Sequence, residues 1–230
     1  MTPIVFLPGL LNDAALWSHQ VAGLADIAAP QVADLTRHDT VADMAAATLA
    51  QAPDRFALAG LSMGGYVAFE MLRQQPERIT RLALIDTRAS LDSPAETQRR
   101  QGFVRLARTG KFKGVTPRLL PALLDEANLN DETLTQTVTG MAQRVGREAF
   151  IRQQTAIMHR PDSRPLLPAI DKPTLVVCGR NDALTPVVEH EFMAERIPDA
   201  DLVVLARAGH LAPLERPAAV TNALRGWLTG

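Results

Sequence analysis

The feature that most constrains this chain is a serine between glycines, at the junction of an apolar run and a helical pattern. The motif Gly60-Leu61-Ser62-Met63-Gly64 directly follows the run Phe56–Ala59. The next residues, Met63–Gln74, have the apolar spacing of a helix. A serine on so sharp a strand-to-helix turn is pushed out at the end of a sheet, and small neighbours let the two backbones approach closely. We therefore predict that Ser62 is a nucleophile on a nucleophile elbow.

The five-residue pattern alone is weak evidence. At average frequencies of glycine and serine it occurs by chance in roughly one chain in thirteen of this length. The alternative is a glycine-rich turn with an idle serine. The nucleophile interpretation depends on the strand and helix around Ser62, and on an acid and a base later in the chain.

Strand and helix patterns alternate along most of the sequence. The expected strands are Ile4–Leu7, Ala28–Leu35, Phe56–Ala59, Arg81–Ile85, Thr174–Cys178 and Leu202–Leu205. The expected helices are Ala14–Leu24, Val41–Ala50 with Thr40 as its cap, Met63–Gln74, Val187–Arg196 and Ala218–Leu228. Such alternation predicts an α/β fold with a doubly wound, mostly parallel sheet.

The middle of the chain interrupts this alternation. Residues 88–168 lack a good strand pattern and indicate helices. Helix breaks are expected at Pro94, Gly110, Gly114, Pro117, Pro121, Gly140 and Gly146. We predict that residues 1–87 and 169–230 form the core and that 88–168 is a helical cap insertion. The cap is expected over the carboxyl ends of the strands, where such folds keep their sites.

Composition favours one compact domain with no special partner surface. The chain has 230 residues, 47% of them hydrophobic, and a net charge of −1. This balance argues against nucleic acid and membrane partners, and no apolar run approaches the ~18 residues of a membrane span. The single cysteine, Cys178, lies in an apolar run and is expected to be buried rather than catalytic. With no basic leader before the first strand, we expect a cytoplasmic location.

Charge is unevenly distributed between the two predicted parts. Residues 88–168 hold 13 Lys and Arg against 8 Asp and Glu, whereas the remainder holds 11 against 17. One interpretation is a cap that attracts an anionic acyl substrate or an acidic carrier protein. The other is that arginines merely solvate the helix exteriors. The cap arginines that would attract an anion are Arg99, Arg100, Arg105 and Arg108.

A serine nucleophile needs a histidine to accept its proton. His210 follows the strand Leu202–Leu205 and the turn Ala208-Gly209, and a loop at the end of a strand suits a general base. Among the other histidines, His190 lies in a helical pattern and is expected to be solvated. His159, in the predicted cap, either faces the pocket or has a structural role.

The histidine in turn needs a carboxylate. Asp182 closes Gly179-Arg180-Asn181-Asp182 after the strand Thr174–Cys178, and Asp86 closes the strand Arg81–Ile85. Both could reach the same edge of the sheet. We favour Asp182, because Thr185-Pro186 would end its loop before the next helix. Asp86 would then cap a helix or support the site from behind.

An oxyanion intermediate needs backbone donors beside Ser62. The N–H of Met63 lies at a helix start, where amides are free and the helix dipole favours negative charge. The turn after the first strand, Pro8-Gly9, offers the N–H of Leu10 as the second donor. Leu11 beside it and His159 are the candidates for substrate binding.

Together these motifs resemble the α/β-hydrolase superfamily, and in particular its small serine esterases with a helical cap. Among them are carboxylesterases that cleave pimeloyl-carrier methyl esters. The similar segments are Val5–Gly9 with Trp17, Gly60–Gly65, Cys178–Asp182 with Thr185-Pro186, and Gly209–Pro217. The resemblance implies Ser62, His210 and Asp182 as the catalytic triad, with Leu10 and Met63 as the oxyanion hole. One departure is Pro8-Gly9, where the family usually has His-Gly.

The predicted activity is hydrolysis of a small carboxylic ester, a small-molecule substrate, through an acyl-serine, without a metal or organic cofactor. Lactone opening, thioester cleavage or carbon–carbon bond hydrolysis on the same triad are alternatives that the cap sequence does not separate. A further alternative is a ligand-binding receptor on a hydrolase scaffold.

Overall fold

The centre of the molecule is a six-stranded sheet whose neighbouring strands all run parallel. The computed structural model describes residues 1–230. The strands are β1 (Thr2–Leu7), β2 (Ala28–Val32), β3 (Phe56–Leu61), β4 (Ile79–Ile85), β5 (Thr174–Gly179) and β6 (Ala200–Leu205). Their spatial order is β2-β1-β3-β4-β5-β6. Because all strands are parallel, their carboxyl ends meet at one edge of the sheet.

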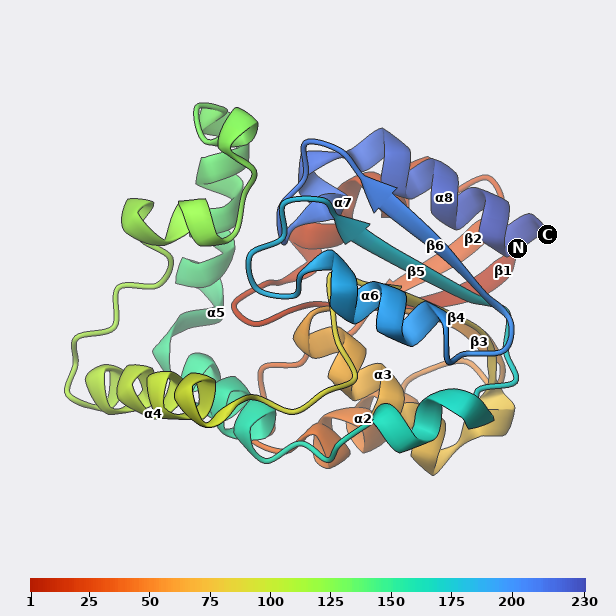
Figure 1. Cartoon of the computed structure of the whole chain (residues 1–230), viewed down its shortest axis with the longest axis horizontal. Helices are drawn as coiled ribbons and strands as arrows, with labels where there is room; N and C mark the ends of the chain where they lie inside the picture. Colours follow the sequence, from red (N-terminus) through yellow and green to blue (C-terminus); the bar gives the residue numbers. More distant parts are fainter.

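Helices cover both faces of this sheet (Figure 1). They are η1 (Ala14–Trp17), α1 (Ser18–Gly23), α2 (Val41–Leu49), α3 (Met63–Gln74), η2 (Pro76–Arg78), α6 (Val187–Ala194), α7 (Ala212–Glu215) and α8 (Pro217–Thr229). Successive strand residues point to opposite faces. In β1, Val5 and Leu7 pack in one core cluster with α2 and α3, whereas Ile4 and Phe6 pack in the other with η1 and α8. The doubly wound α/β fold predicted from the sequence is therefore confirmed.

The elements differ from the expected ones mainly at their ends. The first helix begins as a 3-10 turn over Ala14–Trp17, and β2 ends at Val32 instead of Leu35. The short helix α7, which begins two residues after His210, had no counterpart in the sequence pattern. Four residues carry too little periodicity for a pattern to be recognised. None of the helices combines the length and the apolar character that crossing a membrane requires.

The segment 88–168 contains helices and no strand. Its elements are α4 (Pro94–Arg108), η3 (Pro117–Ala122), η4 (Glu126–Asn128) and α5 (Glu132–Met158), and η5 (Arg164–Ala169) follows across its end. Figure 1 shows α4 and α5 beyond the arrowheads of β5 and β6, at the carboxyl edge of the sheet. We propose that this segment is the cap over a core of residues 1–87 and 169–230. Its last part also packs into the core, since Ala156, Ile157 and Leu167 belong to the cluster that contains α3.

Two of the expected helix breaks are wrong. Gly140 lies inside α5, and Pro121 lies inside η3. No helix continues through Pro94, which begins α4 at a position where a missing N–H costs nothing. Gly146 does interrupt α5, with a positive φ of 75°. The difference between the two glycines is backbone conformation, which sequence spacing does not reveal.

Ser62 lies on a strained turn between β3 and α3. Its φ is 53°, a left-handed value that costs a residue with a side chain on the order of 1–3 kcal/mol. Glycines make the turn possible. A Cβ on Gly60 would lie 2.5 Å from the carbonyl oxygen of Gly64, and a Cβ on Gly64 would collide with the carbonyl group of Leu7. The backbones of β3 and α3 are therefore in direct contact, and this contact directs the side chain of Ser62 out of the sheet.

Replacing Gly64 with alanine tests this close contact. Gly64→Ala should destabilise the protein by about 1–3 kcal/mol or more, because the added methyl group meets the rigid backbone of β1. The matched control is Gly102→Ala within α4, where the nearest atom to a Cβ is 3.8 Å away. That change should stabilise the helix by up to ~1 kcal/mol. Thermal unfolding of both variants is the measurement, and equal melting temperatures would contradict the packing argument.

Candidate active site

Three side chains from distant parts of the chain form a hydrogen-bonded row at the carboxyl edge of the sheet. The Oγ of Ser62 lies 2.8 Å from Nε2 of His210. The Nδ1 of the same ring lies 2.8 Å from Oδ2 of Asp182. An ionised carboxylate only accepts hydrogen bonds, so Nδ1 carries the proton and Nε2 is free to accept the one on Ser62. This arrangement can activate a serine hydroxyl as a nucleophile.

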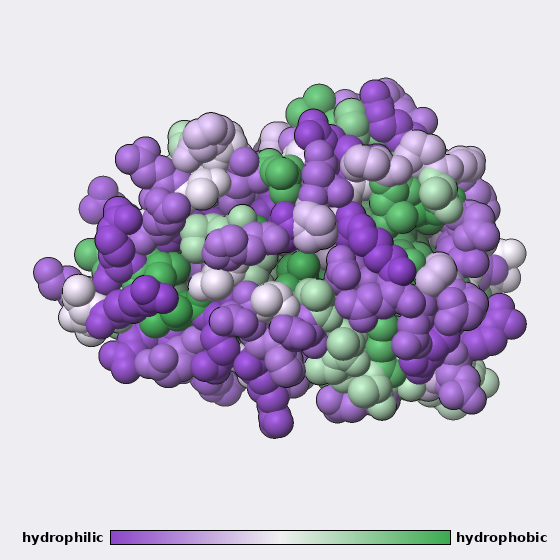
Figure 2. Space-filling view, turned by 90° about the horizontal axis from the view of Figure 1, so that it is seen from below, coloured by the Kyte–Doolittle hydropathy of each residue, from purple (hydrophilic) through white to green (hydrophobic).

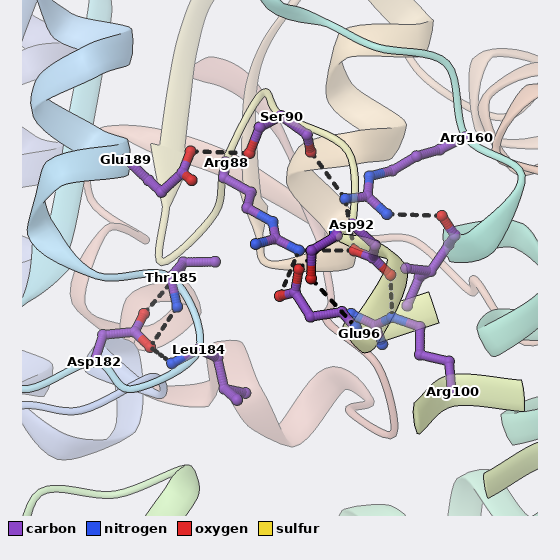
Figure 3. A network of polar contacts seen from close by, with 12 residues as sticks. Arg88, Ser90, Asp92, Glu96, Arg100, Arg160, Asp182, Leu184, Thr185 and Glu189 are labelled. Carbon is purple, nitrogen blue, oxygen red and sulfur yellow. Dashed lines mark hydrogen bonds and ion pairs between the residues drawn. The ribbon is translucent and has the colours of Figure 1, made fainter. Parts of the chain in front are cut away.

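The loop after β5 holds Asp182 as a carboxylate. Its Oδ1 accepts the N–H of Leu184 at 2.8 Å and that of Thr185 at 3.0 Å, and its Oδ2 accepts the Thr185 hydroxyl at 2.6 Å. Figure 3 shows these three contacts. Burial would raise the pKa of Asp182, but His210 and the hydrogen bonds outweigh it and lower that pKa to about 2. The charge needed to stabilise an imidazolium is therefore present at neutral pH.

The loop that carries His210 is held by Glu215. The Oε1 of this buried carboxylate accepts the N–H groups on both sides of His210, from Gly209 at 2.8 Å and from Leu211 at 3.3 Å. Its Oε2 accepts the N–H of Asp125 at 2.7 Å. The N–H of His210 itself donates to the carbonyl oxygen of Leu123 at 2.9 Å. The segment around η3 and η4 and the histidine loop are thus joined by several hydrogen bonds.

The two backbone amides predicted to form an oxyanion hole are those of Met63 and Leu10. Met63 is the first residue of α3, a position whose N–H has no partner within its helix. Leu10 follows the Pro8-Gly9 turn, and its N–H has no acceptor within the chain. The next amide, from Leu11, donates to Oε1 of the buried Gln153 at 3.0 Å. Gln153 therefore fixes the turn from α5 while the Leu10 amide stays available.

Asp86 lies behind this row and is not part of it. The side chain of Asp86, which is fully buried, accepts the N–H of Gly179 at 2.9 Å and that of Ala212 at 3.0 Å. Ala212 begins α7, so Asp86 caps this short helix. Burial and the nearby Asp182 raise the pKa of Asp86 to about 8.

The expectation that His190 is solvated is wrong. Its side chain is fully buried in α6, and Nε2 accepts the N–H of Thr87 at 3.0 Å. Thr87 in turn donates its hydroxyl to the carbonyl oxygen of Ser62 at 2.8 Å. Burial lowers the pKa of His190 to about 4, so the ring is neutral and can accept. A helical pattern with glutamates on either side gave no sign of this buried face.

A cavity of about 520 Å³ opens in front of Ser62 and His210. Leu10 and Leu11 line it, together with apolar side chains from α4 and α5 such as Phe103 and Phe150. His159 does not line the cavity. It is exposed at the end of α5 with Nδ1 2.9 Å from the carbonyl oxygen of Thr155, so its predicted role in substrate binding is wrong.

The cations on the cavity wall are only partly those expected. Arg99 and Arg100 line it, whereas Arg105 and Arg108 do not. Three further cations on the wall, Arg88, Lys111 and Lys113, were not singled out by the sequence. No group of three or more His, Cys, Asp and Glu side chains is arranged to hold a metal ion.

Comparison with known proteins places the chain in a family. A model of the alpha/beta hydrolase family matches residues 4–223. The pimeloyl-(acyl-carrier protein) methyl ester esterase of Nitrosomonas europaea is 26% identical over 93% of this chain and 90% of that protein.

Solved structures agree with this result. A thermophilic esterase from Thermogutta terrifontis, solved with malate bound, is 33% identical and superposes with a TM-score of 0.89, over 100% of this chain and 90% of that one. The enol-lactonase from Burkholderia xenovorans LB400 is 25% identical with a TM-score of 0.89, over 100% of this chain and 92% of that one. The chain therefore belongs to the α/β-hydrolase family. It is a hydrolase of the esterase type.

Several residues around the row escaped the sequence analysis. Glu215 had a visible signal, since it lies within the motif Gly209–Pro217, but the spacing did not show that its side chain would accept the amides beside His210. Gln153 and His190 had none. Both are polar residues in helices, and only the tertiary packing decides which face of a helix is buried.

The pKa of His210 predicts how activity depends on pH. Burial lowers this pKa, but Asp182 outweighs burial and raises it above the ordinary value of 6.5. A base must be neutral to work, so kcat/KM for a neutral ester should fall on the acidic side with a midpoint above 6.5. Asp182→Asn should move this midpoint down and lower kcat by roughly ten-thousand-fold. Asp201→Asn, an exposed change on β6, is the control that should keep the wild-type profile.

If the acidic midpoint of kcat/KM is the same in Asp182→Asn as in wild type, Asp182 does not raise the pKa of His210. The pH profile of kcat/KM, measured with one neutral ester, gives the answer for all three proteins.

Proposed function

We propose that the protein hydrolyses carboxylic esters through an acyl-serine intermediate. Ser62 is the nucleophile, His210 the general base and Asp182 the acid that orients it. The observation that carries this proposal is the pair of 2.8 Å contacts that His210 makes, with Ser62 on one side and Asp182 on the other. The backbone N–H groups of Leu10 and Met63 form the oxyanion hole.

The reaction follows from these positions. His210 Nε2 takes the proton of Ser62 as Oγ attacks the ester carbonyl carbon, and the carbonyl oxygen becomes an anion that accepts hydrogen bonds from the two amides. The carbon–oxygen bond to the alcohol then breaks, and the alcohol leaves with the proton from Nε2. Water attacks the acyl-serine in the same way, and the acid is released as Ser62 regains its proton. No redox step is involved.

A second candidate function is lactone opening on the same residues. An enol-lactonase shares the fold over the whole chain, with a TM-score of 0.89. A lactone is a cyclic ester, so the bond broken and the proton transfers are the same. The cavity, largely apolar and about 520 Å³ in volume, has room for either an acyl chain or a small ring.

We also propose that the acyl group is anionic or carrier-bound. Arg99, Lys111 and Lys113 are exposed cations on the cavity wall. Phe103 and Leu106 on α4 are exposed beside them, 38% and 50% respectively. Figure 2, seen from below Figure 1, shows a mostly hydrophilic face with hydrophobic patches, one of them at the left where α4 lies. Cations around an apolar entrance suit a partner that is acidic and presents an acyl chain.

Removal of the Ser62 hydroxyl tests the nucleophile. Ser62→Ala should lower turnover of a short-chain p-nitrophenyl ester by at least ~10⁴-fold while leaving the melting temperature close to that of wild type. Ser18→Ala, an exposed serine at the start of α1, is the matched control and should keep full activity. A fluorophosphonate probe should add one label to wild type and to Ser18→Ala, and none to Ser62→Ala. Wild-type turnover in Ser62→Ala would end the proposal.

A substrate panel separates the candidate functions. Short esters, matched thioesters, small lactones and a carrier-linked ester are compared by kcat/KM at low and high salt. The proposal expects esters to exceed lactones, and expects KM for the anionic or carrier-linked ester to rise by about threefold or more in high salt, because the cations on the rim are screened. A clear preference for lactones would favour the second candidate function. A KM that does not change with salt would contradict the proposal that Arg99, Lys111 and Lys113 attract an anionic substrate.

A further inference from the structure

One wall of the cavity is formed by a network of ion pairs where the chain leaves β4 and enters α4 (Figure 3). The Nη2 of Arg88 lies 2.7 Å from Oδ1 of Asp92 and 2.9 Å from Oε1 of Glu96. Arg160 and Arg100 also pair with Asp92, one on each carboxylate oxygen. The side chains of Asp92 and Arg160 are 3% and 4% exposed, so the centre of the network is dry.

The charges in this network do not balance. Three guanidinium groups face two carboxylates. Glu189 lies nearby, but it bonds Ser90 and forms no ion pair with the three arginines. Burial alone would raise the pKa of Asp92, but Arg100 and Arg160 outweigh it and lower that pKa to about 2. Burial would also raise the pKa of Glu96, but its hydrogen bonds with Ser93 and the charge of Arg88 outweigh burial and lower that pKa, so both carboxylates are ionised at neutral pH. One positive charge is therefore left over in a poorly hydrated wall, where an unpaired charge is unfavourable.

Arg88 has the largest number of unused donors in the network. Arg160 uses both of its Nη atoms, since it donates to Ile157, Ser90 and Asp92, and it stacks on the ring of Tyr66 at 4.1 Å. Arg100 donates through Nε to Asp92 and through Nη1 to Gln154, and only its Nη2 has no acceptor. In Arg88 only Nη2 has partners, and its Nε is buried with none. Arg88 and Ser62 line the same cavity.

From this geometry we infer that Arg88 binds a carboxylate carried by the ester substrate, through the Nη1 donors that the chain leaves free. The inference rests on the proposed ester hydrolysis and narrows its substrate class to esters or lactones that bear a second, acidic group. Arginine suits this role, because its charge is permanent and its donors match a carboxylate. The substrate anion completes the charge balance of the wall while its ester group lies at Ser62.

Paired substrates test this subsite. Monomethyl glutarate carries the carboxylate, and the methyl ester of glutaric acid monoamide has the same shape without the charge. Wild type should favour the carboxylate by about tenfold or more in kcat/KM, and Arg88→Gln should abolish that ratio. Arg88→Lys, which keeps the charge, should retain part of it. Arg105→Gln on the exposed side of α4, outside the cavity, is the control and should leave the ratio unchanged.

A second variant is expected to raise the preference for the carboxylate, which a folding defect would not do. Glu96→Gln removes the negative charge from Arg88 while glutamine can still accept the capping hydrogen bond from Ser93. It should raise the ratio severalfold. A ratio near one in wild type, or a ratio that Arg88→Gln and Glu96→Gln leave unchanged, would overturn the inference.

Binding without turnover separates this inference from the proposed function. Glutarate, at about ten times its Kd, should raise the melting temperature of Ser62→Ala by about 3 °C, and should not do so in the double variant Ser62→Ala, Arg88→Gln. Glutarate binding that depends on Arg88, in a protein that hydrolyses no ester, would sink the proposed function and leave the subsite standing. Ester turnover with no glutarate effect would do the reverse.

Discussion

The site depends on one hydrogen bond, between Ser62 and His210, which joins residues 148 positions apart. The parallel sheet brings these two side chains together. Ser62 follows β3, His210 follows β6 and Asp182 follows β5, so each begins at the carboxyl edge. The sheet sets this common edge, and the loops need only a few residues to bring the side chains together. The bare-backbone contact between β3 and α3 then turns Ser62 out of the sheet by imposing its positive φ.

The sheet, its order of elements and the three side chains of the row could be predicted from the sequence, for a physical reason. Strands buried on both faces leave continuous apolar runs, as in Thr174–Cys178, and chemistry placed at their ends leaves polar residues at fixed positions just after them. What failed depended on which face of a helix packs inward. His190 is buried in α6, whereas His159, just after the end of α5, is exposed. Gly140 and Gly146 are six residues apart in one helix, and only the second changes the backbone.

The positions of the cations in residues 88–168 were also only partly predictable. The sequence showed an excess of cations over residues 88–168 but could not separate those that touch the cavity from those that face water. The structure divides them, since Arg105 and Arg108 are exposed while Arg88 and Arg100 are held by Asp92 and Glu96. The network that results is both a support for the start of α4 and a charged patch in an otherwise apolar wall. A single carboxylate, Asp92, meets three arginines, so its loss would leave several cations facing one another.

The bonds that Glu215 and Leu123 make have a consequence for how the protein can open. The strand-free segment and the loop of His210 share Glu215 as an acceptor, and Leu123 accepts directly from the amide of His210. The segment around η3 and η4 is therefore hydrogen-bonded to the loop that carries His210. Moving this segment away from the core would also move the imidazole away from Ser62. An opening movement that keeps Ser62, His210 and Asp182 in contact must therefore take place on the other side of the cavity, at the exposed helix α4.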